Sequence, residues 1–279
     1  MDADTVAIFH PGAVTADAFA RGNHDLARQL VDFVSCLNPG IGALVLSMGE
    51  VDIRTHYWRD LPILVSRGVS VQQVIETKVR AFVHQVTGVC EHFGFPEAIL
   101  WGPPASNVPG TASNEEFPTT GDNATRNILT HLFSRECFAI ANAGHPRFRF
   151  ATLFYDMVSD DFGTQPGWLA DGVHMAPDLK FRCLDRLAPV VARQVTAVAG
   201  DRIDRFNRLS FQLADVPVSS SEGNGVALPY RTWLSTDHSP QIAFGGTTSG
   251  YSLADGLSGK STAEPVSELV LRSLDVPLP

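Results

Sequence analysis

The chain has 279 residues, 44% hydrophobic and 18% charged, and this ordinary composition excludes disorder, collagen and coiled coil as the main architecture. Its 21 basic and 30 acidic residues give a formal net charge of -9 at pH 7, so we expect no nucleic-acid partner. There is no apolar run of about 18 residues, and the acidic start meets Pro11 and Gly12 rather than forming a secretory signal, so we expect a cytoplasmic protein without a membrane partner.

The cysteines and histidines do not indicate a metal or cofactor site. Cys36, Cys90, Cys137 and Cys183 lie tens of residues apart, without the close pairs of a zinc ribbon. A chain of this length with a full core does not need a disulfide framework, so we expect buried free thiols. Among the nine histidines, His84 and His92 lie eight apart on a helix without a carboxylate partner at ligand spacing, and His145 and His238 are isolated, so we expect no metal and no cofactor.

The first elements in chain order are two short apolar strands around a helix. Residues 6–9 (VAIF) form a candidate strand, and Asn23 can cap a helix that Pro39 and Gly40 end. The apolar residues of that helix are Leu26, Leu30, Phe33, Val34 and Leu37. Residues 43–46 (ALVL) are apolar at every position, which predicts a strand buried on both faces.

A long helix and a second strand follow. Ser70 and Gln73 form a capping-box pattern that predicts a helix start. One face of this helix carries Val71, Val74, Ile75, Val79, Phe82, Val83 and Val86. Residues 98–101 (AILW) predict a strand that Gly102 ends, and residues 105–120 are rich in Ser, Asn, Pro and Thr and predict a loop.

The remaining elements repeat the alternation of helix and strand. Asp122 can cap a third helix with Ile128, Leu129, Leu132 and Phe133 on its apolar face, and residues 148–153 predict a strand. Pro177 fits the first turn of a fourth helix, which Pro189 should kink or split. We expect its residues Leu184, Leu187, Val191, Val195 and Val198 to point inward.

This alternation predicts a three-layer α/β/α domain with a parallel sheet over residues 1–200. Residues 201–279 are richer in Ser, Gly and Thr, and we expect a β-rich or loop-rich C-terminal region there. An alternative is that this region is an incomplete second domain. Ligands bind at the carboxyl ends of parallel strands, so chemistry should lie in the loops at residues 10–15, 49–56, 102–107 and 156–174.

The strongest local signal is the pair Asp171 and His174 in the segment WLADGVHM. Two side chains three positions apart in a tight turn can meet, and Gly172 frees the backbone for that turn. The Asp171 carboxylate can then accept the Nδ1 proton of His174 and leave Nε2 as a base. The alternative is that Asp171 is a turn residue and His174 caps the next helix.

The second signal, SMGEVDIRTH, directly follows the predicted strand at 43–46. Gly49 lets a backbone N–H group approach a substrate oxygen, as an oxyanion donor must. Asp52 and Arg54 can orient this loop, or pair with each other and tie it down.

Together, the GEVDIR and DGVH segments resemble the third and last blocks of the SGNH (GDSL-type) hydrolases, most closely the bacterial polysaccharide-associated branch with a Gly-Glu-Ile-Asp-x-Arg block. The resemblance spans roughly residues 6–198. It implies a flavodoxin-like α/β/α sandwich and Ser-His-Asp catalysis on O-acyl esters, often acetyl groups on sugars. His174 would be the general base, Asp171 its orienting acid and Gly49 an oxyanion donor.

Two positions depart from the family pattern. Val51 replaces the usual oxyanion-hole Asn, a change that the Glu-Ile-Asp branch shares and that leaves Asp52 or Arg54 to take over part of the work. The Gly-Asp-Ser block that carries the nucleophile is absent, because residues 1–7 contain no Ser. The resemblance therefore implies a sheet lacking its first strand, in a fragment, a misassigned start or a protein that has lost its nucleophile.

No residue of the chain clearly replaces the missing serine. We expect Ser47 to pack at the end of its strand, and Thr15 is a poor nucleophile without activation. A strand running into a Gly-rich turn at residues 242–249 is a third, weaker alternative.

Two functional hypotheses follow, with a carbohydrate or another O-acylated small molecule as the partner. The first is an SGNH-type esterase or acyltransferase, inactive or truncated if no nucleophile is supplied. The second is a catalytically dead carbohydrate-binding or polysaccharide-assembly scaffold. A flavodoxin-like cofactor binder ranks last, because residues 10–15 supply little of a phosphate-cradling loop. The oligomeric state does not follow from the sequence.

Overall fold

The computed structural model describes residues 15–21, 43–57, 70–107, 121–170, 174–198 and 203–207. Within these residues, four strands form one sheet in chain order: β1 (Leu44–Ser47), β2 (Ala98–Trp101), β3 (Phe148–Ala151) and β4 (Ala197–Val198). All three neighbouring pairs are parallel, which confirms the predicted pairing. Their carboxyl ends therefore meet at one edge of the sheet.

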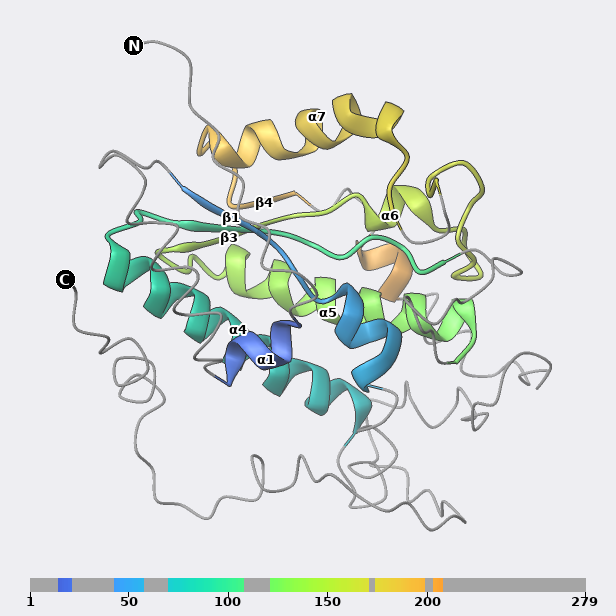
Figure 1. Ribbon diagram of the computed structural model, residues 1–279, viewed down its shortest axis with the longest axis horizontal. Helices are drawn as coiled ribbons and strands as arrows, with labels where there is room; N and C mark the ends of the chain where they lie inside the picture. Colours follow the sequence, from blue (N-terminus) through green and yellow to red (C-terminus); the bar gives the residue numbers. More distant parts are fainter. Residues whose placement is uncertain are drawn as a thin grey trace.

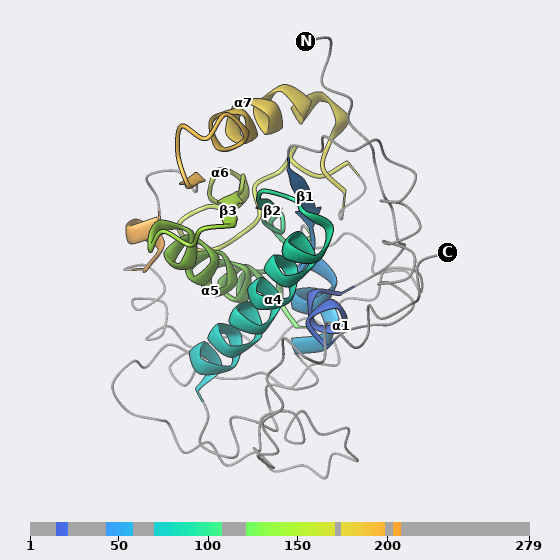
Figure 2. The ribbon, with the colours of Figure 1, turned by 90° about the vertical axis from the view of Figure 1, so that its left-hand side faces the viewer.

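Helices cover both faces of this sheet. Figure 2 shows α7 (Lys180–Val191) on one side of the strands, and α1 (Ala16–Ala20), α4 (Val71–Phe93) and α5 (Asn123–Asn142) on the other. Figure 1 shows the same layers along the strands, with the short helix α6 (Phe154–Met157) following β3. The described residues thus form an α/β fold with a four-stranded parallel sheet flanked by helices.

The two long helices begin where the sequence predicts. Ser70 and Gln73 form the capping box of α4, with Ser70 Oγ accepting from the Gln73 N–H group at 3.1 Å and Gln73 Oε1 accepting from the Ser70 N–H group at 2.9 Å. Asp122 caps α5 by accepting from the Thr125 N–H group at 2.8 Å. The predicted apolar faces of both helices are buried in the main core.

β3 ends at Ala151, two residues earlier than predicted, because residues 152 and 153 already turn the chain into α6. The Thr152 hydroxyl accepts a hydrogen bond from the Phe154 N–H group at 3.0 Å, and this contact turns the chain directly after Ala151. The segment at 148–153 is therefore strand only as far as Ala151.

β1 forms as predicted, but it is not buried at every position. Val45 is 48% exposed and Ser47 is exposed, so the prediction that Ser47 packs is wrong. Among the described strands β1 has β2 as its neighbour on one side and stands at the end of the sheet, so one face of it receives less cover.

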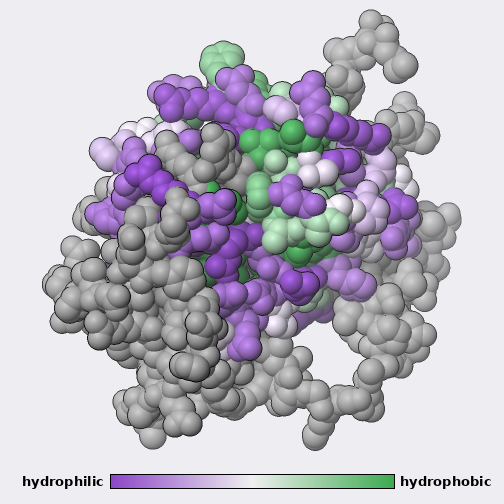
Figure 3. Space-filling model, turned by 180° about the vertical axis from the view of Figure 1, so that it is seen from behind, coloured by the Kyte–Doolittle hydropathy of each residue, from purple (hydrophilic) through white to green (hydrophobic). Residues whose placement is uncertain are grey.

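Helix α7 forms, but its orientation differs from the prediction. Its inner side carries Leu187 and the buried Val190, which pack against Ile99 and Ala151 of the sheet. Leu184, Val191 and Val195 are exposed rather than inward, because the buried positions follow a different stripe of the helix than the one predicted. Figure 3 shows hydrophobic side chains reaching the surface among hydrophilic ones.

Pro177 lies in a short 3-10 turn, η2 (Pro177–Leu179), that leads into α7. Pro189 stands inside α7, which ends two residues later at Val191, and Val198 lies in β4 rather than in the helix. Proline removes a helical hydrogen-bond donor, so an end near this position is its ordinary effect.

Several predictions fall outside the described residues: the strand at 6–9, the helix at 23–37, and nearly all of residues 201–279. Residues 203–207 are described and helical, and Phe206 is buried against His131, Tyr155 and Phe162. The proposed division at residue 200 stays a prediction. Of the cysteines within the described ranges, Cys90 and Cys137 are buried free thiols and Cys183 is a half-buried one. No helix in the described ranges combines the length and apolar character that crossing a membrane requires.

Candidate functional site

Two of the loops predicted to carry chemistry meet at the carboxyl ends of β1 and β2. A small, shallow pocket open to solvent is lined by Glu50, Ile53, Arg54, Pro104, Ser106 and Thr130. The first three follow β1, the next two follow β2, and Thr130 comes from α5. The adjacent parallel strands bring the 49–56 and 102–107 loops together.

Gly49 makes the turn out of β1. Its φ of +102° lies in the region that favours glycine, and an added Cβ would lie 3.1 Å from Cζ of Phe133. The Gly49 carbonyl accepts a hydrogen bond from the Ile53 N–H group at 3.1 Å, which starts the helical turns that follow. The glycine predicted as an oxyanion donor thus occupies a sharp, closely packed turn at the carboxyl end of β1.

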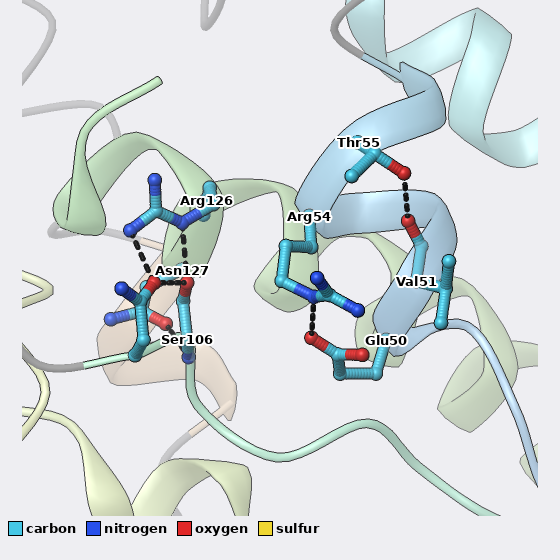
Figure 4. A network of polar contacts seen from close by, with 8 residues as sticks. Glu50, Val51, Arg54, Thr55, Ser106, Arg126 and Asn127 are labelled. Carbon is cyan, nitrogen blue, oxygen red and sulfur yellow. Dashed lines mark hydrogen bonds and ion pairs between the residues drawn. The ribbon is translucent and has the colours of Figure 1, made fainter. Parts of the chain in front are cut away.

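The turn continues into a π-helical segment, η1 (Asp52–His56). Arg54 Nε donates to Glu50 Oε1 at 2.7 Å, and the Thr55 hydroxyl donates to the Val51 carbonyl at 2.8 Å (Figure 4). The Arg54 side chain is only 6% exposed. Single π-helical turns are frequent at functional sites, and here the turn directs Glu50 and Arg54 to the pocket.

Asp52 does not pair with Arg54, the alternative that the sequence left open; its partners lie at the start of α1. Its carboxylate accepts hydrogen bonds from the N–H groups of Ala16 at 2.7 Å and Asp17 at 3.2 Å, at the start of α1. Burial raises the pKa of Asp52 to about 6, although the two N–H groups oppose this shift. In the structure Asp52 therefore ties α1 to the loop, as a carboxylate at a helix N-terminus does.

Ser106 stands on the other side of the pocket in a second polar group (Figure 4). Its Oγ accepts from Nε of Arg126 and donates to Oδ1 of Asn107 at 3.2 Å, while Nη2 of Arg126 donates to the same Asn107 oxygen at 2.6 Å. The Ser106 N–H group donates to Oδ1 of Asn127 at 2.7 Å. The sequence pointed to the loop at 102–107, but nothing in it singled out Ser106.

His174 is described, whereas Asp171 lies outside the described residues. The His174 side chain is exposed, and its carbonyl accepts from the Ala170 N–H group at 2.8 Å. Leu169 and Met175 form an antiparallel bridge, so the chain reverses direction between them. Three of the four residues of DGVH lie outside the described residues, so the tight turn at this segment and contact between Asp171 and His174 both stay predictions.

The other nucleophile candidates differ in their surroundings. Thr15 is buried, and its hydroxyl caps α1 by accepting from the Ala18 N–H group at 2.9 Å. Ser47 is exposed on β1, and residues 242–249 lie outside the described residues. Within the described ranges, no group of three or more His, Cys, Asp or Glu side chains is arranged to hold a metal ion.

The sequence matches no family model, and no curated protein matches it. Two solved structures are similar. One is described as "a putative platelet activating factor from Streptococcus pneumonia", with 13% identity over 60% of this chain and a TM-score of 0.41. The other is "a putative acylhydrolase" from Bacteroides fragilis, with 15% identity over 66% of this chain and a TM-score of 0.42. The chain spans 66% of the first protein, just under two thirds, and 72% of the second.

Proposed function

We propose that this protein hydrolyses or transfers O-acyl groups, such as acetyl groups of a carbohydrate, at the pocket between the loops that follow β1 and β2. The observation that carries the proposal is the Gly49 turn, with its φ of +102°, at the carboxyl end of a parallel strand. A glycine at such a turn lets a backbone N–H group approach a substrate oxygen, as an oxyanion donor must. Gly49 opens the GEVDIR segment, and the DGVH segment follows it later in the chain, in the order that suggested this chemistry.

The proposed roles follow from the chemistry of ester cleavage. Attack on the acyl carbon places negative charge on the carbonyl oxygen, and the Gly49 N–H group would stabilise that charge. His174 would take the proton of the attacking hydroxyl and return it to the leaving alcohol, and Asp171 would orient the imidazole. Glu50 and Arg54 line the same pocket and are suited to contact sugar hydroxyls.

An assay of the full chain with an aryl acetate and with O-acetylated oligosaccharides tests the proposal. We expect hydrolysis that falls by roughly 100-fold or more in His174→Ala, because a general base contributes about that much. His84→Ala is the matched control, since His84 is another exposed histidine, on α4 away from the strand ends. Equal rates in the two variants would overturn the role of His174.

The same protein samples distinguish the second hypothesis, a carbohydrate-binding scaffold, from the enzyme. Its support is that Thr15 serves as a helix cap and Ser47 lies exposed on a strand, so neither is held as an activated nucleophile. Hydrolysis at the uncatalysed rate together with glycan binding that survives His174→Ala would favour the scaffold over the enzyme.

A further inference from the structure

We infer that Ser106 is the nucleophile that accepts the acyl group. This inference rests on the proposed function and supplies the one group that the sequence left unassigned. The carrying observation is that Ser106 lines the pocket while its Oγ accepts a hydrogen bond from the guanidinium of Arg126.

Position selects Ser106 among the residues that line the pocket. Ile53 and Pro104 offer no reactive atom, and Glu50 is engaged with Arg54 in an ion pair at 2.7 Å. Thr130 carries a hydroxyl, but it donates at 3.1 Å to the Arg126 carbonyl inside α5. Ser106 offers a primary hydroxyl in a loop at the carboxyl end of β2, where ligands of parallel sheets bind.

Arg126 supplies a fixed positive charge at the reacting oxygen. It is 4% exposed, and its guanidinium is held by Ser106 Oγ, by Asn107 Oδ1 and by the Gly121 carbonyl. A guanidinium stays protonated at all ordinary pH values, so it stabilises the negative charge that develops on Oγ as the O–H bond breaks. Asn107 Oδ1 accepts a hydrogen bond from the Ser106 hydroxyl at 3.2 Å, and this contact orients the O–H bond.

The backbone of Ser106 is held from both sides. Its N–H group donates to Asn127, and its carbonyl accepts from the Thr164 hydroxyl at 2.6 Å and from Nδ2 of Asn123 at 3.3 Å. Asn127 and Thr164 are themselves joined, with Nδ2 donating to Oγ1 at 2.9 Å. This support fixes the position of Oγ before substrate binds, which a nucleophile requires.

The reaction is a transfer in two steps. Ser106 Oγ forms a bond to the acyl carbon, the ester C–O bond breaks, and the serine proton ends on the alcohol that leaves. Water then attacks the acyl-serine, its proton passes to Oγ, and the carboxylic acid is released. No oxidant, reductant or further reactant is needed.

A fluorophosphonate probe tests this assignment, because such probes bond covalently to activated serines. Wild-type protein is labelled and the modified residue is located by peptide mass spectrometry. We expect the label on Ser106, and we expect Ser106→Ala to lose the label and at least roughly 1,000-fold in hydrolysis. Ser47→Ala, which removes an exposed serine hydroxyl from β1, should keep both.

A second variant separates activation from folding. Arg126→Lys keeps a positive charge but loses the planar contacts to Ser106 and Asn107, so labelling should slow while the protein stays folded by circular dichroism. If Ser106→Ala fails to fold, the labelled residue in wild-type protein still decides the question.

The outcomes distinguish this inference from the proposed function. A label on another residue, with hydrolysis intact in Ser106→Ala, overturns the role of Ser106 and leaves the esterase proposal standing. Wild-type protein that neither hydrolyses esters nor takes up the probe overturns both.

Discussion

Asp52 and Ala16 join two parts of the chain that lie 36 positions apart, through a hydrogen bond of 2.7 Å from the Ala16 N–H group to the Asp52 carboxylate. A second bond from the Asp17 N–H group and an ion pair of 2.8 Å between Asp17 and Lys78 extend this contact to α4. The loop that carries Glu50 and Arg54 is thus bonded to α1 and, through α1, to α4. Its conformation should therefore depend on the charge of Asp52.

Replacing Asp52 by Asn should change how stability depends on pH. Burial raises the pKa of Asp52 from 3.8 to about 6, so the folded state holds the proton more tightly than the unfolded state. The favourable contribution is full below pH 3.8 and is lost as the pH rises through about 6, by on the order of 3 kcal/mol. Asp52→Asn removes this titration.

The measurement is urea unfolding of both proteins between pH 4 and pH 7. The free energy of unfolding of wild type relative to Asp52→Asn should fall as the pH rises through this window. A constant difference would show that the carboxylate keeps its ordinary pKa.

His131 should produce the opposite dependence. Its Nδ1 lies 3.1 Å from the Tyr155 hydroxyl and its Nε2 lies 3.0 Å from Oδ1 of Asn207, and burial lowers its pKa to about 3. The unfolded chain binds the proton more readily, so the contribution of His131 is full above pH 6.5 and is lost as the pH falls toward 3.

His131→Phe removes this titration and leaves Asn207 and Tyr155 without the imidazole, at a cost of about 1–3 kcal/mol at pH 7. The stability advantage of wild type, measured by urea unfolding, should shrink as the pH is lowered from 7 to 4. A control, His84→Phe, alters an exposed histidine and should shift stability little at any pH. A wild-type advantage that persisted unchanged at pH 4 would contradict the assigned role.

Gly49→Ala should destabilise the protein more than Gly94→Ala. Both glycines have positive φ, +102° and +73°, but a Cβ on Gly49 would lie 3.1 Å from the Phe133 ring while a Cβ on Gly94 would meet nothing within 4 Å. We expect about 2–3 kcal/mol for Gly49→Ala and about 1 kcal/mol for Gly94→Ala. Thermal unfolding of the two variants checks this order, and equal losses would mean that the ring moves aside freely.

The variants Gly49→Ala and Gly94→Ala also test the proposed activity. Gly49→Ala should also lower ester hydrolysis, because it displaces the turn that presents the backbone N–H group. Gly94, at the far end of α4, should leave hydrolysis unchanged.

The sequence by itself determined the elements whose causes lie within a few residues. The capping pairs Ser70–Gln73 and Asp122–Thr125 connect positions three apart, so the starts of α4 and α5 were predictable. The apolar run at 98–101 predicted β2, and the glycine after β1 predicted a turn. The buried side of α7 was not predictable, because apolar residues lie on more than one side of that helix. Packing against Ile99 and Ala151 of the sheet decides which side is buried.

Only the tertiary structure decided which distant side chains meet. Asp52 accepts a hydrogen bond from the start of α1 rather than pairing with Arg54. Ser106 lines the same pocket as Glu50 and Arg54. These contacts depend on the register of β1 against β2, which pairs Ser47 with Trp101. A local pattern carries no information on that register, because it is set by the packing of the whole sheet between its helices.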